Sequence, residues 1–438
     1  MRLGSALTPS LMHVKKSQFR YMINAALDET GSTRYGEKFL LKEAKSLIEF
    51  ARGSEIINGG FGYLNSQGLV DSSQPRQTYV QCRMIQVFGL THVMGLQNNS
   101  RLIKHGVDAL NDLFFDQGNS GFFNAIDALG KPIGNSKLGY DHMFVLLAAV
   151  TSTAAGVDGS LKLLQRAEDA IDRFFWDPEF EMMNDQWDRE FRMLNDYRGI
   201  NVNMHAVEAL TAAFDLTKDN KYLDRALAIC KRTINEFARN NQWLLPEHYS
   251  SIWKPELEFN HDNPADQFRP YGVTIGHLFE WSRLVMQVGL YVKGQAGYEW
   301  IEEGARKLYD LAKKYGWNVD DSLGFIYTMD WQMRPVVHSR MQWVAAEAVM
   351  AAFVLWRITG DQTYLIDYEN WWLFIDHHVI DREFGSWRHE LNSQLQVIET
   401  TWPGKPDIYH ALNACLLPLL PFQPSFIGAV IAHADSAI

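Results

Sequence analysis

The sequence predicts an all-α protein in which twelve helices form an (α/α)6 barrel, with short β-hairpins at one rim. A short segment rich in glycine and aromatic residues recurs six times, mostly at intervals of roughly sixty residues. The stretches between these segments carry apolar residues at helical spacing. Six units of helix, hairpin and helix can close into a ring whose inner helices line a bowl. An open helical superhelix is the alternative arrangement of the same units.

The recurring segments are typical of short hairpins, because they alternate like strands and are bounded by Gly, Asp or Asn. Helical periodicity between them is clearest over 205–216, 222–238 and 341–358. The stretches TKDNKYLDRA at 217–226 and TGDQTYLIDY at 359–368 share a turn that ends one helix and begins the next. The six segments occupy residues 59–64, 120–127, 180–188, 242–250, 323–330 and 384–391.

These repeats place residues 18–422 in one barrel domain that carries the active site. Residues 1–17 form an N-terminal extension that we expect to be flexible, and residues 423–438 form a C-terminal tail. In a closed barrel the hairpins lie at one rim, and the concave centre holds a small-molecule site.

Composition excludes several classes of protein. Of the 438 residues, 47% are hydrophobic and 21% charged, which is typical of a soluble globular protein. The net charge of −11 argues against nucleic acid as a partner. Cys82, Cys230 and Cys415 are an odd, sparse set, so we expect reduced thiols and a cytoplasmic protein. The apolar runs 143–150 and 344–356 are too short to span a membrane, and we find no targeting segment.

Three polar positions interrupt otherwise apolar helices. Asn201 and His205 are four residues apart and share a helix face. His277 and Glu280 are three apart, so the carboxylate can lie near the imidazole. His410 opens an apolar helix, where the helix N-terminus disfavours the protonated imidazole. A single histidine of this kind is more often structural, but three such helices indicate a site.

Arg83 lies among apolar neighbours in a predicted helix, and a buried arginine needs partners. Its planar guanidinium suits sugar hydroxyls or an enediolate oxygen. The structural alternative is an arginine paired with an inner-helix carboxylate such as Glu280.

Metal and cofactor sites are not indicated, because the sequence has no H-E-x-x-H, C-x-x-C, Asp-rich or Gly-rich phosphate motif. We therefore expect no metal and no cofactor. A glycoside hydrolase would need two opposed acids. Asp188, Asp330 and Glu390 in the hairpin segments could serve, although we favour roles in turns and at the rim for them.

At these residues the sequence resembles a known family, the N-acylglucosamine 2-epimerase superfamily, and within it the mannose isomerase and sulfoquinovose isomerase branch. The similarity runs in order from about residue 18 to about residue 420. It implies an (α/α)6 barrel and cofactor-free interconversion of an aldose with its ketose or its C2 epimer. The motifs that carry it are Arg83, the stretch from Asn201 to Ala209 around Asn203-Met204-His205, Asn263-Pro264-Ala265, Gly276-His277 with Glu280-Trp281, Gly385-Ser386-Trp387 with Glu390, and Trp402 with Lys405 through His410.

The resemblance also implies roles for single residues. His277 and His410 correspond to a catalytic acid/base pair, and Arg83 and Glu280 complete the catalytic set. The residues expected to bind the sugar are Tyr140, Asn201, His205, Trp343 and Trp402.

The chemistry implied is proton transfer at C2 of an open-chain aldose through a cis-enediol, with Arg83 stabilising the oxyanion. A ketose forms if the same imidazole returns the proton to C1, and an epimer forms if the opposite imidazole returns it to C2. We assign His410 as the shuttling base and His277 to ring opening, although the sequence alone does not fix which histidine plays which part.

The expected reaction interconverts D-mannose and D-fructose, with D-lyxose and D-xylulose as a second pair. The alternatives are a mannose 2-epimerase, an (α/α)6 glycoside hydrolase and a non-catalytic binding protein. In the sulfoquinovose isomerase, glutamines stand where this chain has His389 and Pro406, and an arginine stands where it has Gln267. A neutral hexose is therefore the expected substrate. The oligomeric state cannot be read from the sequence.

Overall fold

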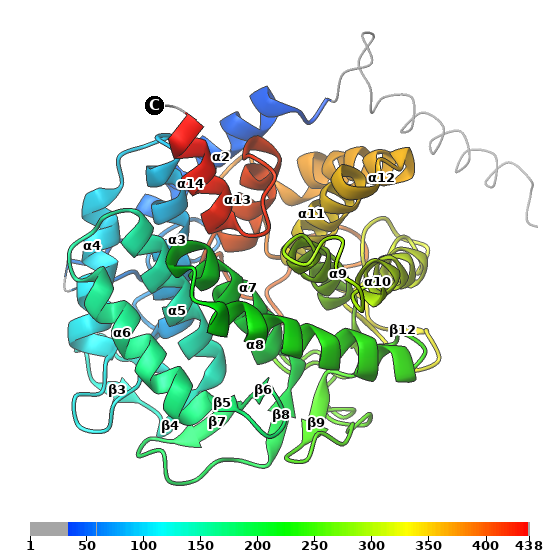
Figure 1. The fold of residues 1–438 in the computed structure, drawn as a ribbon. Helices are drawn as coiled ribbons and strands as arrows, with labels where there is room; N and C mark the ends of the chain where they lie inside the picture. The colour runs from blue at the N-terminus through cyan, green and yellow to red at the C-terminus, as the bar shows by residue number, and fades with distance from the viewer. Residues whose placement is uncertain (1–33, 58, 437–438) are drawn as a thin grey trace, which may run out of the picture.

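Six inner helices form a closed ring in the computed structural model, which describes residues 34–57 and 59–436. The predicted N-terminal extension, residues 1–17, lies outside the described residues. Each inner helix packs against the next, and the last packs against the first, so the ring closes (Figure 1). The inner helices are α3 (Thr78–Val93), α5 (Gly139–Ala154), α7 (Ile200–Thr217), α9 (Ile275–Gly289), α11 (Gln342–Thr359) and α13 (Tyr409–Leu416).

A second layer of six helices covers the ring, and each of them packs mainly against one inner helix. This arrangement confirms the predicted (α/α)6 barrel and excludes the open superhelix. Four of the outer helices end in a π-helical turn, at Leu110–Phe114, Ile171–Phe175, Lys231–Ala238 and Ile375–Val379. The outer helices are α2 (Glu37–Arg52), α4 (Ser100–Ala109), α6 (Ser160–Ala170), α8 (Asn220–Cys230), α10 (Trp300–Gly316) and α12 (Gln362–Phe374).

The inner helices are buried on nearly all sides, which explains their weak amphipathicity in sequence. In α11, for example, thirteen of eighteen residues are buried. One side of such a helix packs on the outer layer and the flanks on neighbouring inner helices, so apolar residues are favoured almost all round. The polar residues that remain, such as Glu347, therefore lie where the helices face the barrel axis or one another.

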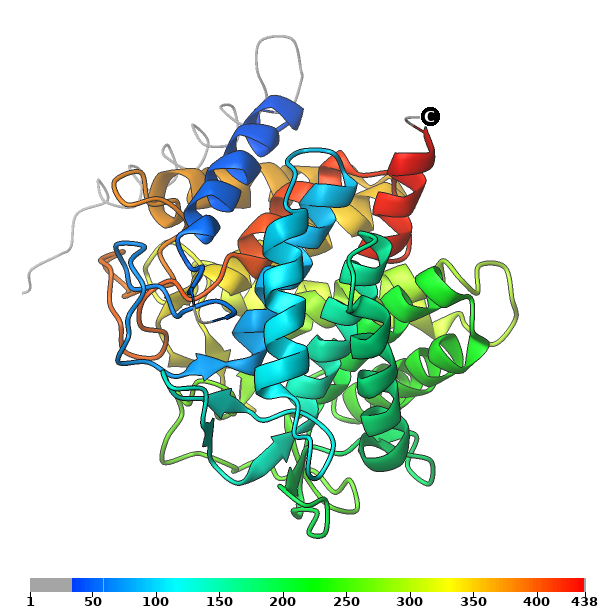
Figure 2. The same ribbon diagram turned by 90° about the vertical axis from the view of Figure 1, so that its left-hand side faces the viewer.

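Short strands gather at one end of the barrel (Figure 2). The strand before an inner helix pairs antiparallel with a strand that follows the next outer helix, as in Gly199↔His248 and Met341↔Glu390. The recurring segments were expected to be self-contained hairpins; most instead combine a local bridge, such as Phe115↔Phe122, with a pairing to the preceding unit. The strands are β1 (Arg76–Gln77), β2 (Ala125–Ile126), β3 (Pro132–Ile133), β4 (Ser136–Leu138), β5 (Trp176–Asp177), β6 (Met182–Met183), β7 (Gln186–Asp188), β8 (Tyr197–Gly199), β9 (His248–Ser250), β10 (Val273–Thr274), β11 (Thr328–Met329), β12 (Pro335–Val337), β13 (Arg340–Met341) and β14 (Glu390–Leu391).

This pairing fixes where five of the inner helices begin, because α3, α5, α7, α9 and α11 each start directly after a strand. The N-terminal turns of the inner helices therefore converge on the strand-bearing end of the ring. Helix N-termini carry partial positive charge and unpaired N–H groups. That end of the barrel favours polar and anionic ligands.

The C-terminal residues contribute α14 (Phe426–Ser436), which packs against α3, α5 and α7 at the end of the barrel away from the strands (Figure 1). A 3-10 turn at Leu417–Leu419 precedes it. Ser425 and Tyr291 both donate hydrogen bonds to Asp215 Oδ2, at 2.6 and 2.8 Å. These contacts hold the start of α14 on the barrel.

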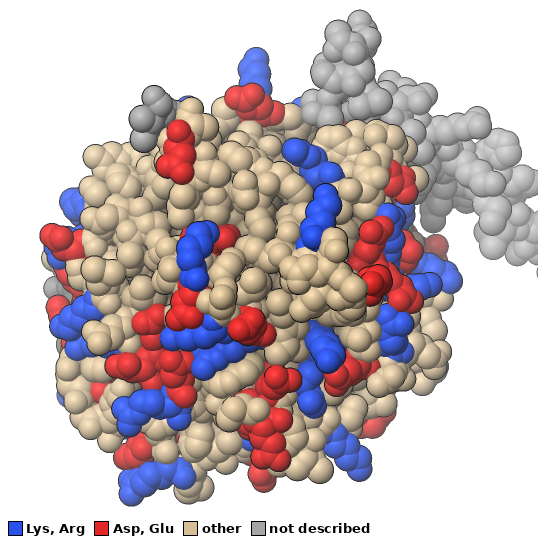
Figure 3. All heavy atoms as spheres, in the orientation of Figure 1, with Lys and Arg blue, Asp and Glu red and all other residues tan. Residues whose placement is uncertain are grey.

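The surface of the face shown in Figure 3 mixes Lys and Arg with Asp and Glu, without a continuous basic area. This agrees with the acidic net charge of −11. In the part of the chain that the structure describes, no helix has both the length and the apolar character needed to cross a bilayer.

Candidate active site

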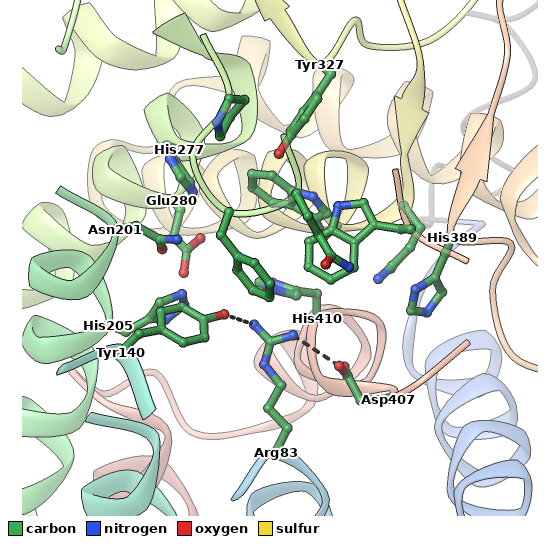
Figure 4. Close-up of a pocket in the computed structure, with 16 residues that line it drawn as sticks. Arg83, Tyr140, Asn201, His205, His277, Glu280, Tyr327, His389, Asp407 and His410 are labelled. Atoms are coloured by element: carbon green, nitrogen blue, oxygen red, sulfur yellow. Dashed lines mark hydrogen bonds and ion pairs between the residues drawn. The ribbon is translucent and has the colours of Figure 1, made fainter. Parts of the chain in front are cut away.

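The strand-bearing end of the barrel opens into a cavity of about 600 Å³, including its mouth. Its walls come from all six inner helices and from loops between units (Figure 4). All nine residues that the sequence analysis assigned to the site line this cavity. The complete lining is Arg83, Tyr140, Asn201, His205, Gln267, Phe268, Pro270, His277, Glu280, Tyr327, Gln342, Trp343, His389, Trp402, Asp407 and His410.

Arg83 lies at the floor of the cavity between two partners (Figure 4). Its Nη1 donates to Asp407 Oδ2 at 3.1 Å, and its Nη2 donates to the Tyr140 hydroxyl at 2.9 Å. Burial raises the pKa of Asp407, but the charge of Arg83, the nearby His389 and the hydrogen bond from the Tyr409 N–H together outweigh burial and keep this pKa below its usual value. The structural alternative considered for Arg83 was a pair with a carboxylate such as Glu280, and the carboxylate that binds it is Asp407. The guanidinium is thereby fixed with one edge toward the cavity.

His277, in the first turn of α9, is held by a carboxylate from another unit. Its Nδ1 lies 2.9 and 3.0 Å from the two oxygens of Glu247, which directly precedes β9. We expected Glu280 to be the neighbour of this imidazole, on the basis of sequence spacing. The hydrogen-bond partner of His277 is instead Glu247, and Glu280 lies 3.7 Å from Arg283. With Nδ1 engaged, Nε2 is the nitrogen left for a ligand.

His410, in the first turn of α13, has an equivalent partner on α11. Its Nδ1 lies 2.8 Å from Glu347 Oε1, and Glu347 Oε2 accepts a hydrogen bond from Arg283 Nε at 3.0 Å. Burial, reinforced by the Arg83 charge, holds the pKa of His410 well below its usual value. The imidazole is therefore neutral at pH 7, with its Nδ1–H on Glu347 and the lone pair of Nε2 free to accept a proton.

A buried acidic layer lies beneath the histidines. Glu208, Glu280 and Glu347 are all fully buried, and Arg283 interacts with all three. Burial, together with the negative charge of Glu347, raises the pKa of Glu280 well above its usual value. This shift favours the protonated form of Glu280, which can donate as well as accept a hydrogen bond. The Glu208 carboxylate is held by the Tyr409 hydroxyl.

Two sets of side chains in this layer are close enough to share an ion, namely His205, Glu208 and Glu280, and Glu280, Glu347 and His410. Several of these groups are engaged otherwise. Glu347 binds Arg283 and His410, and Arg283 already supplies a positive charge where a metal would. These carboxylates and imidazoles are therefore better suited to hydrogen bonding with one another and with Arg283 than to binding a metal ion.

Trp343 packs against both histidines. Its ring centroid lies 5.2 Å from that of His277 and 5.8 Å from that of His410. Gly276 permits this position, because a Cβ at residue 276 would overlap the indole ring. A flat apolar surface flanked by two imidazoles suits the carbon face of a sugar.

The acids considered for glycoside hydrolysis do not line the cavity. Glu390 accepts hydrogen bonds from the backbone N–H groups of residues 400–402. Asp330 binds Arg334, and Asp188 accepts from the Arg192 N–H. These three acids stabilise turns, as favoured by the sequence analysis.

The sequence analysis did not assign four charged residues that hold the side chains of the site in place. These residues are Glu247, Arg283, Glu347 and Asp407. Glu347 and Arg283 are charged residues within buried helices, which is a signal that a sequence alone can give. Glu247 lies in a recurring hairpin segment, where nothing in the pattern connects it to His277.

Comparison with known proteins agrees with this geometry. The family model of N-acylglucosamine 2-epimerase (GlcNAc 2-epimerase) matches residues 59–414. The chain belongs to the N-acylglucosamine 2-epimerase family. That match covers the first five inner helices and most of α13, and it includes Arg83, His277 and His410.

Individual members of the family are also similar to this chain. A D-mannose isomerase from Thermobifida fusca is 40% identical over 389 residues, which cover 89% of this chain and 95% of the relative. A D-mannose isomerase from Pseudomonas cannabina pv. alisalensis is 40% identical over 396 residues, covering 90% and 95%. A crystal structure of a D-mannose isomerase superposes with a TM-score of 0.82 at 26% identity, covering 89% of this chain and 99% of that one.

Proposed function

We propose that this protein is a D-mannose isomerase that interconverts D-mannose and D-fructose without a cofactor. The observation that carries the proposal is the pair of imidazoles of His277 and His410, which face one cavity and are each held at Nδ1 by a buried carboxylate. This arrangement leaves two Nε2 atoms for proton transfer at one cavity. The similarity to two D-mannose isomerases over about nine-tenths of the chain supports the choice of sugar.

The reaction begins when the sugar ring opens and exposes the C1 aldehyde. His410, neutral at pH 7, removes the C2 proton through Nε2. The electron pair of the broken C2–H bond forms the C1–C2 double bond, and O1 takes up a proton to give the cis-enediol. The enediol then loses the O2 proton, and C1 receives the proton held by His410. The product is the ketose, with C2 oxidised and C1 reduced by the same two electrons.

Charge that develops on O1 and O2 is stabilised by fixed groups. The Arg83 guanidinium, anchored by Asp407 and Tyr140, is a cation at the cavity floor. The N-terminal turns of the inner helices add partial positive charge at the same end of the barrel. His277 and Glu280 move protons between the oxygens. None of these groups has to reorganise as the enediolate forms.

Product analysis tests the proposal. Purified protein is incubated with D-mannose in water and in D2O, and the sugars are followed by NMR. We expect fructose, with solvent deuterium at C1 to the extent that the His410 proton exchanges. D-lyxose should give D-xylulose more slowly. Glucose as the main product would instead identify a mannose 2-epimerase, and absence of turnover with either sugar would contradict the proposal.

A further inference from the structure

The structure assigns to Glu247 the task of positioning His277: it holds the imidazole in the tautomer and orientation that present Nε2 to the sugar. This inference rests on the proposed function for its effect on turnover. The contact itself belongs to the folded protein and can be measured without any sugar.

The hydrogen bond between His277 and Glu247 is short, involves both carboxylate oxygens and is buried. Nδ1 of His277 lies 3.0 Å from Glu247 Oε1 and 2.9 Å from Oε2. Glu247 is 4% exposed and His277 7% exposed, so water does not compete for this hydrogen bond. A carboxylate only accepts hydrogen bonds. Nδ1 must therefore carry the proton, and in the neutral ring Nε2 carries the lone pair.

The backbone around Glu247 is fixed from two directions. Its carbonyl accepts the N–H of Ile200 at 3.0 Å, which ties it to the first residue of α7. The next residue, His248, has its Nδ1 2.8 Å from the Tyr197 hydroxyl and its Nε2 2.8 Å from the Pro270 carbonyl. The carboxylate thus comes from a rigid part of the rim, as a group that orients a catalytic side chain requires.

The two histidines of the site differ in how their carboxylates are shared. Glu347, the partner of His410, also binds Arg283 through Oε2. The Glu247 side chain forms its hydrogen bonds and its ion pair with His277 alone, within residues 34–57 and 59–436. The Glu247 carboxylate therefore serves one imidazole only. Replacement of Glu247 should disturb His277 and leave the buried acidic layer around Arg283 intact.

The test compares Glu247→Ala, Glu247→Gln and Glu247→Asp with wild type. Glu256→Gln is the control, because Glu256 lies in the segment that follows β9 and is exposed. We expect Glu247→Ala to lower kcat on mannose about 10- to 100-fold, the scale of losing a group that orients a functional histidine, with a smaller change in KM. Glu247→Asp should recover more activity than Glu247→Gln, because an amide can donate as well as accept and no longer enforces one tautomer.

A second readout separates positioning from a general loss of structure. Nitrogen-15 NMR of the ligand-free protein should show His277 protonated at Nδ1 in wild type and Glu247→Asp, and a mixture of tautomers in Glu247→Gln. Wild-type kcat and an unchanged His277 signal in both Glu247→Ala and Glu247→Gln would overturn the inference. If wild type fails to convert mannose, the proposed function fails, and the tautomer measurement still decides the role of Glu247.

Discussion

The Nδ1 atom of His410 lies 2.8 Å from Glu347 Oε1, across the gap between α13 and α11. The two residues are 63 positions apart, and each begins or interrupts an otherwise apolar helix. Ring closure brings them together, since α11 and α13 are neighbours in the barrel. The contact makes His410 the better candidate for the C2 base, because it directs Nε2 toward the cavity while burial keeps the ring neutral.

Replacement of His410 should therefore remove the base. We expect His410→Ala to lower turnover by roughly 10²–10⁴-fold, the usual contribution of a positioned acid or base, with less effect on sugar affinity. His410→Asn should not rescue the rate, because an amide does not accept a proton at neutral pH. Exchange of the mannose C2 proton with D2O measures this step. His261→Ala is the control, since that side chain is 63% exposed. Exchange at the wild-type rate in His410→Ala would transfer the role to another group.

Activity should survive chelation. Arg283 already places a positive charge within the acidic layer, with its Nε 3.0 Å from Glu347 Oε2. We expect kcat/KM for mannose to be unchanged after exhaustive dialysis against EDTA, and unchanged again when Mg²⁺, Mn²⁺ or Zn²⁺ is added. Loss of activity that one divalent ion restores would show that the neighbouring carboxylates and imidazoles bind a metal after all.

Sulfoquinovose should be a poor substrate compared with mannose. Arg83 is the one Lys or Arg among the described residues that line the cavity, and Asp407 neutralises it. Burial lowers the pKa of His389 to about 4, so this side chain is uncharged at pH 7. Gln267 offers a place for a cation, and Gln267→Arg should raise the ratio of kcat/KM for the sulfonated sugar to that for mannose. A wild-type preference for the sulfonated sugar would contradict this account of the cavity.

Gly276→Ala should displace Trp343. The added Cβ would overlap the indole, and overpacking of a filled site costs about 1–3 kcal/mol of stability. Because Trp343 packs against both His277 and His410, kcat/KM should fall together with Tm. Gly118→Ala is the matched control, since a Cβ there would meet its nearest neighbour, an oxygen of Asp116, at 3.5 Å. Wild-type activity and Tm in Gly276→Ala would show that the indole can move freely.

The protein should lose stability as the pH falls below about 6.5, and His142 should be one cause. His142 Nε2 accepts the Phe122 N–H at 3.0 Å, and its Nδ1 lies 2.6 Å from the Leu138 carbonyl, which fixes the neutral ring. Burial lowers the pKa of His142 to about 3. From pH 6.5 downward the unfolded state binds a proton that the folded state refuses, so stability decreases with decreasing pH.

The expected contribution of His142 is about 2 kcal/mol between pH 6.5 and pH 5, at about 1.4 kcal/mol for each pH unit. Urea denaturation at the two pH values measures it. His142→Gln should be less stable than wild type at pH 6.5 but should lose less on acidification, because an amide does not titrate in this range. An equal loss in both proteins would assign the acid sensitivity to other groups.

The sequence by itself determined the barrel and the position of most of the site. A period of roughly sixty residues and helices that are apolar on nearly all sides allow few arrangements other than a closed double ring. Polar residues near the start of such helices, such as Asn201, His277 and His410, must then meet at one end, because successive inner helices run in the same direction. The described structure confirms these predictions.

Only the tertiary structure decided which carboxylate serves which imidazole. Sequence spacing favoured Glu280 for His277, because residues three apart on a helix are neighbours. The ring brings Glu247 from another unit to that position and leaves Glu280 to Arg283. Local spacing reports contacts within one helix, whereas a site at the centre of a ring is assembled across helices. Its hydrogen bonds join residues 30 and 63 positions apart, which no local pattern encodes.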